Sequence, residues 1–317
     1  MRTTAINEKY IKIINNKQIF INQKQLKEMA TTNASAPKSA PAKKQSQGFT
    51  GIKSGFAVII CCWVIAELIY VFGFGHVSNF QGGDAAGASF AFFSEADLQP
   101  ANLMGTVYKG GFIVPIIWTL LLTTIALGIE RFFAIRTAYG KESLDKFVAK
   151  IKKALAANKI EEAEAICDKQ RGSVANVVGA TLKRYKEMHE NTVLTKEQKV
   201  LSIRQELEEA TALEMPMLQE NLPIVGTIVS LGTLTGLLGT VLGMIRSFGA
   251  MNSGEGGTNS AALATGISEA LVNTASGIAT GAFSTIVYNY FTNKIDRLTF
   301  SLDEVGFSIV ETFNATH

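Results

Sequence analysis

The chain has 317 residues and a net charge of +3; 47% of residues are hydrophobic and 18% are charged, below the roughly 25% charged residues of average soluble domains. Residues 56–130 and 222–291 contain a single lysine or arginine each, which excludes an ordinary soluble enzyme domain. The small net charge argues against a nucleic-acid partner. Cys61, Cys62 and Cys167 lack the spacing of a zinc site, so we expect no metal and no cofactor.

The first 55 residues are polar and contain ten lysines and arginines. Residues 31–47 are rich in Ala, Pro, Lys and Ser, a composition typical of disorder. We therefore expect residues 1–55 to form a disordered cytoplasmic segment, with Met29 as an alternative start. The apolar run at 56–75 lies too far from the N-terminus for a signal peptide and predicts a first transmembrane helix.

Three further apolar runs predict transmembrane helices, at 112–130, 222–247 and 261–291. A helix needs roughly 20 apolar residues to cross about 30 Å of hydrocarbon, and each of these runs is about that long or longer. Because lipid cannot satisfy bare backbone groups, these runs must be helical.

The positive-inside rule orients the four spans. Residues 131–221 contain 16 lysines and arginines and are expected in the cytoplasm. Residues 76–111 and the turn 248–260 are expected in the periplasm. The tail 292–317 then returns as a cytoplasmic C-terminal helix, so that both termini lie inside a bacterial inner membrane.

The cytoplasmic segment shows helical periodicity, with apolar residues at three- and four-residue spacing from Leu144 to Leu155. It predicts a helical domain without an active site, and Pro216 and Pro223 predict kinks where it enters the third span. The fold class is therefore all-α: a polytopic membrane helical bundle with an extended cytoplasmic helical domain.

The third span has one continuous face of small and polar residues. Its members recur at spacings of three and four and are Thr233, Gly236, Thr240, Gly243 and Ser247. The pairs Gly232/Gly236 and Gly239/Gly243 are GxxxG motifs, which allow helix backbones to approach closely.

The fourth span has a similar face, formed by Glu269, Asn273, Gly277, Thr280 and Ser284, with Thr274 beside it and Gly277/Gly281 as a further GxxxG pair. A carboxylate inside a membrane is costly unless it faces the bundle interior or water, so Glu269 is a candidate functional residue. Hydroxyls donate and accept hydrogen bonds, which suits protons. The alternatives are that the polar faces serve only helix packing and that Glu269 is a protonated structural residue.

Glu130 and Arg131 follow the second span and are expected as charges at the membrane interface, where long side chains reach water. Arg246 is expected to do the same near the outer end of the third span.

Two motifs resemble the ExbB/TolQ/MotA proton-channel superfamily, and ExbB most closely. Residues 236–244 read GLLGTVLGM and residues 266–275 read GISEALVNTA. The Glu130-Arg131-Phe-Phe segment and Thr227-Ile-Val-Ser230 also fit, and the resemblance covers roughly 112–300.

The resemblance implies a pentamer whose last two helices line a central pore. It implies a dimer of a single-span, ExbD-like partner that carries the proton-binding aspartate, and a TonB-like protein driven by the motor, all within membrane lipids. By position, Thr240 and Thr274 match the pore threonines and Glu269 matches the family glutamate. Asn273, Thr233, Gly236, Gly243, Thr280 and Ser284 are further candidates for the pathway, and Gly232, Gly239, Gly277 and Gly281 for helix packing.

Two features depart from the family pattern. Gly232-Thr233 stands where the family usually has Ala-Pro, and the span at 56–75 is additional to the three of the simplest members. The leading hypothesis is a proton-channel subunit that energises TonB-dependent outer-membrane transport. A Tol-type motor, a flagellar stator, a proton-coupled secondary transporter and a membrane scaffold stay open, whereas no nucleophile–base pair or phosphate loop favours an enzyme.

Overall fold

The computed structural model describes residues 55–81, 89–91, 99–252 and 260–316. The expected disorder of the N-terminal segment and the alternative start at Met29 lie outside the described residues. Within them every regular element is helical, apart from two isolated β-bridges, His76–Phe90 and Phe80–Pro100. The expected all-α membrane bundle is thereby confirmed.

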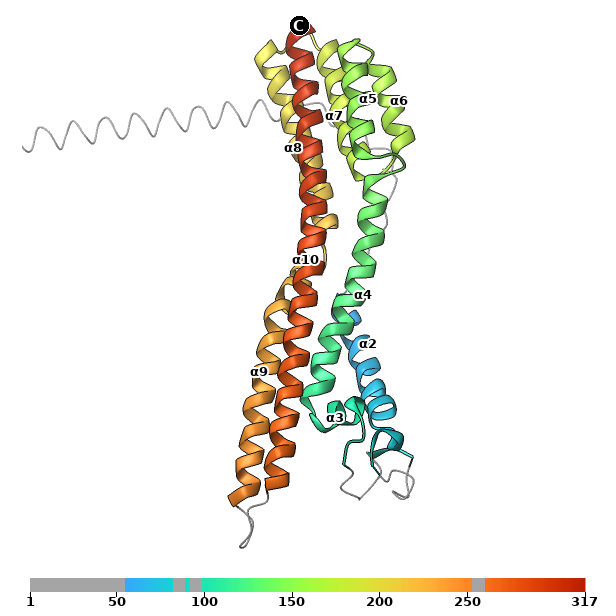
Figure 1. Ribbon diagram of the computed structural model, residues 1–317. Coiled ribbons are helices and arrows are strands. Elements are labelled where there is room, and N and C mark those ends of the chain that lie inside the picture. Colours follow the sequence, from blue (N-terminus) through green and yellow to red (C-terminus); the bar gives the residue numbers. More distant parts are fainter. Residues whose placement is uncertain (1–54, 82–88, 92–98, 253–259, 317) are drawn as a thin grey trace, which may run out of the picture. The chain divides into compact units, whose positions relative to one another are not determined.

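The N-terminal part of the bundle is formed by α2 (Gly55–Leu68), which continues as a π-helical turn, η1 (Ile69–Phe74), and by α4 (Ile113–Tyr139). Between them lie a 3₁₀ turn, η2 (Val77–Asn79), and the short helix α3 (Leu103–Lys109). Figure 1 shows α2 alongside the first half of α4, and the two helices are in contact.

Four helices follow α4 and build the helical domain: α5 (Leu144–Ala156), α6 (Ile160–Gln170), α7 (Ser173–Glu190) and α8 (Lys196–Gln219). Thr195 begins α8 with a capping box, in which its hydroxyl accepts from the Gln198 amide and the Gln198 side chain accepts from the Thr195 amide. Pro216 does not end α8.

The last two helices are α9 (Leu222–Asn252) and α10 (Ser260–Thr316), and they pack against each other over most of α9 (Figure 1). Helix α10 runs without interruption across residue 291, where the sequence analysis divides a span from a separate C-terminal helix. One helix therefore carries both the GISEALVNTA motif and the C-terminal segment.

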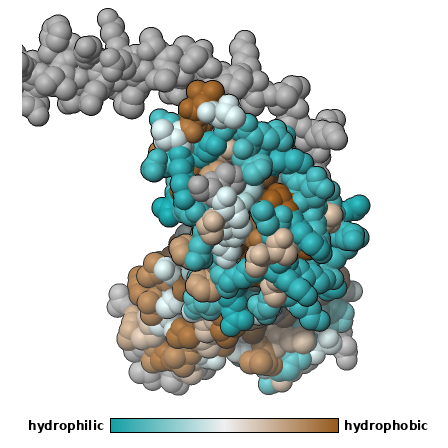
Figure 2. Space-filling model, turned by 90° about the horizontal axis from the view of Figure 1, so that it is seen from above, coloured by the Kyte–Doolittle hydropathy of each residue, from teal (hydrophilic) through white to brown (hydrophobic). Residues whose placement is uncertain are grey.

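Within the described residues, four helical segments are long and apolar enough to cross a membrane: Gly55–Phe74, Ile113–Ala156, Leu222–Gly249 and Gly266–Thr316. Their outward faces are rich in exposed large apolar side chains such as Trp63, Ile129 and Val241, as a lipid-facing surface requires. The chain is thus a multi-pass membrane protein. In Figure 2 hydrophilic residues cover most of the nearer, domain end of the chain, whereas hydrophobic residues gather farther away.

The core of the helical domain includes the C-terminal half of α10. Leu298, Leu302, Val305, Ile309 and Phe313 are almost fully buried against α5, α7 and α8. Because these residues recur every three or four positions, one stripe of α10 closes the domain.

The turn after α4 is clamped to the turn after α6. Gly140 and Gly172 have φ angles of +79° and +90°, and a Cβ at either would stand 2.6 Å from a carbonyl oxygen of the facing turn. Buried Gln170 donates from Nε2 to the Tyr139 and Glu142 carbonyls, at 2.8 and 2.9 Å. The clamp fixes the direction in which α5 leaves the long helix α4.

Cys167 provides a test of this packing. Burial raises the pKa of its thiol to about 12, and only the thiolate is a good nucleophile. At pH 8 we therefore expect N-ethylmaleimide to leave Cys167 unmodified in the folded protein and to modify it after denaturation, as measured by peptide mass spectrometry. Rapid modification of the folded chain at pH 8 would contradict the packing of α6 on α7.

Candidate functional site

Glycines bring the backbones of α9 and α10 into direct contact. A Cβ on Gly277 would lie 2.6 Å from both the Gly232 carbonyl oxygen and the Gly236 Cα, and one on Gly281 would lie 2.9 Å from the Val229 carbonyl oxygen. A Cβ on Gly239 would lie 2.6 Å from the Asn273 Cβ. The structure therefore places all four candidate packing glycines at the α9–α10 contact.

Two threonine hydroxyls meet where the glycines allow this close approach. Thr240 on α9 and Thr274 on α10 are hydrogen-bonded through their Oγ1 atoms. Each hydroxyl also reaches the Gly236 carbonyl, at 3.3 Å, and the Ala270 carbonyl, at 3.5 Å from Thr240 and 3.3 Å from Thr274.

The geometry of this pair is compatible with the transfer of a proton between hydroxyls. The two hydroxyl protons have more acceptors than they can serve at once, because two carbonyls and the opposite hydroxyl all lie within reach. Either hydroxyl can therefore turn its proton toward the other or toward a carbonyl. Both side chains are half-buried, so the pair is open on one side to whatever lies beside the chain.

Asn273 bonds the segment before α4, whereas its neighbour Thr274 bonds α9. Its side chain is 3% exposed and its Nδ2 donates to the Gly110 carbonyl at 2.9 Å, while its buried Oδ1 has no hydrogen-bond partner within the described residues. Gly110 lies between α3 and α4. Asn273 thus fastens α10 to the segment just before α4, and its place in a proton pathway stays a prediction.

Ser284 faces α4 inside the chain, whereas Thr280 lies beside Gly232 of α9. Both are almost fully buried, and Ser284 Oγ is 2.8 Å from Thr124 Oγ1 of α4. Thr124 was not among the residues predicted from the sequence, although Thr119, Thr123 and Thr124 form a polar cluster in an otherwise apolar span. These hydroxyls lie between helices and not on the outer surface of the chain, and their pathway role stays a prediction.

Thr233 and Gly243 also lie on the α9–α10 side of α9. Thr233 is half-buried, its Oγ1 donates weakly to the Val229 carbonyl at 3.5 Å, and it faces Gly281. A Cβ on Gly243 would stand 2.8 Å from the Ala270 Cβ. Gly236 and Gly243 therefore allow α9 and α10 to approach closely. Their carbonyl oxygens accept hydrogen bonds from nearby Thr and Ser hydroxyls.

Glu269 is half-buried and lies in a charged group at the start of the pathway face. Its carboxylate, Glu67 and Arg246 are all close enough to Tyr70 to interact with it electrostatically. Tyr70 donates to the Tyr108 carbonyl at 2.8 Å. The additional N-terminal span therefore brings Tyr70 toward Glu269, a proximity that spacing along the sequence could not reveal.

Arg246 lies against the N-terminal end of α4. Its guanidinium carbon lies 5.7 Å from the centre of the Phe112 ring, a cation–π arrangement. A Cβ on Gly111 would stand 3.2 Å from the same guanidinium group. The Arg246 side chain thus covers the residues at the start of α4.

Glu130 and Arg131 are not interface charges that extend into water. Arg131 is fully buried and Glu130 is 6% exposed. Arg131 donates to the Glu130 carboxylate through Nε, at 2.6 Å, and through Nη2. The expected reach into water fails because the end of α8 covers this part of α4.

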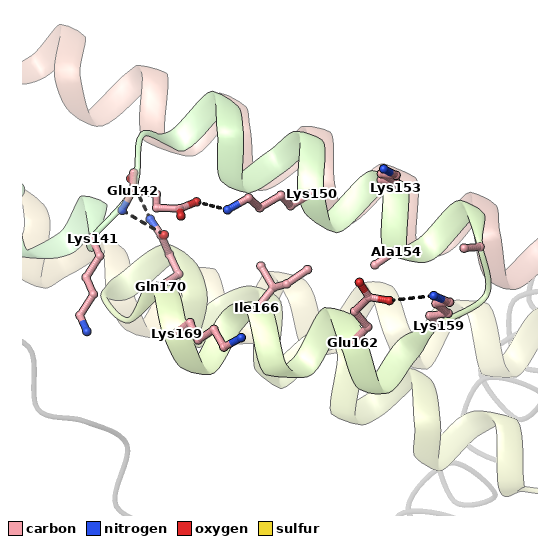
Figure 3. A pocket seen from close by; sticks show the side chains of 11 residues that line it. Lys141, Glu142, Lys150, Lys153, Ala154, Lys159, Glu162, Ile166, Lys169 and Gln170 are labelled. Atoms are coloured by element: carbon pink, nitrogen blue, oxygen red, sulfur yellow. Dashed lines mark hydrogen bonds and ion pairs between the residues drawn. The ribbon is translucent and has the colours of Figure 1, made fainter.

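A basic groove of about 610 Å³ lies between α5 and α6 in the helical domain (Figure 3). Its five lysines face two carboxylates. Lys150 is paired with Glu142 at 2.5 Å, which lowers the pKa of that carboxyl, and Lys159 is paired with Glu162 at 3.2 Å. The groove is open and its charges are partly neutralised within the chain.

The described residues contain no cluster of His, Cys, Asp and Glu side chains that could hold a metal ion. The groups brought together in the membrane helices are hydroxyls, carbonyls, one amide and carboxylates. Such groups can donate, accept and exchange protons.

Residues 172–304 match the MotA/TolQ/ExbB proton channel family. The match contains α7 to α9 and most of α10, and with them the Thr240–Thr274 pair.

Curated relatives point in the same direction. Two Synechocystis sp. (strain PCC 6803) proteins, biopolymer transport ExbB-like 3 and ExbB-like 1, are 40% and 42% identical over 86 and 83 residues. These matches cover 27% and 25% of this chain. The Tol-Pal system protein TolQ of Pseudomonas aeruginosa (strain PAO1) is 24% identical over 190 residues, or 58% of this chain and 81% of TolQ. The chain spans only 41% and 33% of the length of the two ExbB-like proteins.

Proposed function

We propose, from the match of residues 172–304 to the MotA/TolQ/ExbB proton channel family and from the similarity to ExbB-like proteins and TolQ, that this chain is the proton-channel subunit of an inner-membrane motor. The motor uses the proton motive force to energise TonB-dependent outer-membrane transport. The observation that carries the proposal is the hydroxyl pair of Thr240 and Thr274, which shares two carbonyl acceptors at the closest approach of α9 and α10. Glu269 lies one helical turn before Thr274 and would exchange protons with the outer side.

The motor is an assembly, because this chain supplies only one part of the machinery. We propose a homo-pentamer around a dimer of an ExbD-like, single-span partner, with a TonB-like protein as the driven component. The partner's membrane aspartate would meet the Thr240–Thr274 pair from its half-exposed side. Both termini would lie in the cytoplasm of a bacterium.

A Tol-type motor is the second candidate, and one observation favours it. The match to TolQ covers 81% of that protein, against 41% and 33% for the ExbB-like relatives, although its identity is lower. A flagellar stator would share the same channel chemistry. A secondary transporter or a scaffold would have no need of a relay between two helices.

Purification from native membranes in a mild detergent tests the proposal. Mass spectrometry of all retained proteins is expected to find a small single-span protein with one membrane aspartate and a short periplasmic domain. A partner with a peptidoglycan-binding domain would favour a stator instead. Recovery of the chain alone, as a monomer or dimer, under conditions that preserve other complexes would contradict a motor subunit.

The assembly itself has a candidate contact on the C-terminal half of α10. Phe300 and Phe307 are 70% and 64% exposed and lie seven residues apart, hence on one helix face. Such exposed aromatic surface marks protein contacts. We expect the double variant Phe300→Glu/Phe307→Glu to reduce the oligomer fraction severalfold in native mass spectrometry.

The matched control is Lys183→Glu, an exposed charge reversal on α7, which should leave the oligomer intact. An unchanged oligomer in the phenylalanine double variant would show that α10 does not join subunits at this face.

A further inference from the structure

The helical path is interrupted between α8 and α9, where the helical domain joins the third span. At this break the backbone groups at the end of α8 need hydrogen-bond partners. Helix α8 ends at Gln219, Asn221 has a φ of +63°, and α9 begins at Leu222. The last four carbonyls of a helix have no donor within that helix. Those of α8 are Pro216, Met217, Leu218 and Gln219, at the boundary between the membrane helices and the helical domain.

Arg131 of α4 supplies donors to two of these carbonyls. Its Nη1 donates to the Met217 carbonyl at 2.9 Å and reaches the Leu218 carbonyl at 3.4 Å. A cation at the C-terminal end of a helix is also favoured by the helix dipole. The remaining guanidinium donors are held by Glu130, so that a fully buried cation is both neutralised and fixed in direction.

The same place receives the start of the additional N-terminal helix. A Cβ on Gly55 would stand 2.8 Å from Asn221 Oδ1 and 2.5 Å from Ile224 Cδ1. Helix α2 therefore abuts the α8–α9 break, and Arg131 of α4 bonds the end of α8. The helices α2, α4, α8 and α9 therefore meet at one junction. Within it, the Arg131 side chain bonds α4 to the end of α8.

We propose that Arg131 is a positioning residue that fastens the α8–α9 break to α4, so that movements of the membrane helices reach the helical domain. The mechanical consequence rests on the proposed function. Without the fastening, Glu220, Asn221 and the contacts of both helices with α10 would still connect α8 to α9, but the end of α8 would be held less firmly and the angle between the two helices would vary more. Protons would still cross the Thr240–Thr274 pair, but their passage would no longer move α8.

The test uses the full-length complex and a variant that removes both charges. Loss of Arg131 alone would remove the cation that neutralises the buried Glu130 carboxylate, which is far more disruptive than removing both charges. The variant is therefore Glu130→Gln/Arg131→Met. Arg131→Lys is a second variant that keeps the charge but cannot bond a carboxylate and a carbonyl with one planar group. Arg136→Met, an exposed arginine of the same helix, is the matched control.

The first measurement is the distance between spin labels at Phe133→Cys on α4 and Leu213→Cys on α8, both exposed positions. The background carries Cys61→Ser, Cys62→Ala and Cys167→Ala, and labelled chain is diluted with unlabelled chain so that each complex carries one labelled subunit. We expect a narrow distribution in the parent and in Arg136→Met, and at least a twofold broader one in both Arg131 variants. Equal widths would overturn the proposal.

The second measurement compares proton flux with motor output, here the energised uptake or envelope function of the native host. We expect the double variant to keep flux within about twofold of the parent and to lose at least tenfold in output. Equal loss of both, with the assembly intact, would place Arg131 in the channel and overturn the positioning role. A parent complex that conducts no protons would refute the proposed function, while the label distances would still decide whether Arg131 fastens the break.

Discussion

Replacing Thr274 by Val is expected to lower proton flux through the assembled complex by about 10²-fold, the low end of what one positioned proton-transferring group contributes. Val keeps the shape of Thr and removes the hydroxyl, so Thr240 would lose its hydroxyl partner on α10 and keep only carbonyl acceptors. Thr240→Val is expected to act similarly, and the two effects should not add, because both break the same pair.

Thr274→Ser is the matched control, because it retains the hydroxyl and should keep most of the flux. The measurement is the fall in cytoplasmic pH after external acidification, followed with a pH-sensitive fluorescent protein in cells that express the chain and its partner. Glu269→Gln is expected to reduce the same signal while the complex stays assembled. A scaffold would tolerate all of these changes, so an unaltered flux in Thr274→Val would refute the relay.

Gly277→Val is expected to prevent assembly of the membrane helices. The first side-chain carbon would stand 2.6 Å from the Gly232 carbonyl oxygen and the Gly236 Cα, both backbone atoms that cannot turn aside. Overpacking of this kind costs about 1–3 kcal/mol when neighbours can shift, and more is expected where two backbones are already in contact.

Gly249→Val near the end of α9 is the control, because a Cβ there would meet no described atom within 4 Å. Thermal unfolding in detergent should show a large fall in the melting temperature for Gly277→Val and little change in it for Gly249→Val. Similar melting temperatures would mean that α9 and α10 are not held together by this close contact.

The membrane helices could be predicted from the sequence because their signals are local. Apolar runs near 20 residues identify spans, and glycines at four-residue spacing identify a close helix contact. Thr240 and Thr274 could be paired only through the family resemblance, since nothing local says which face of α9 meets which face of α10. The uninterrupted course of α10 to Thr316 was missed because its composition changes at residue 291 while its helix does not.

Residues that depend on tertiary neighbours could not be placed in advance. Asn273 and Thr274 are adjacent in a similar polar face, yet one bonds the Gly110 carbonyl and the other bonds Thr240. Arg131 resembles an interface charge in the sequence but is buried, because the end of α8 lies over it. Tyr70 gave no signal, and only the packing of the additional helix brings it near Glu269.

Proton flux into vesicles tests the central claim most directly. The complex of this chain with the proposed single-span partner is reconstituted into vesicles that enclose a pH-sensitive dye. A potassium diffusion potential, negative inside, is then applied with valinomycin. We predict acidification of the interior well above that of empty vesicles, and its loss in the Thr274→Val complex. Flux equal to that of empty vesicles, from a complex shown to be intact by size and composition, would contradict the assignment of a proton channel.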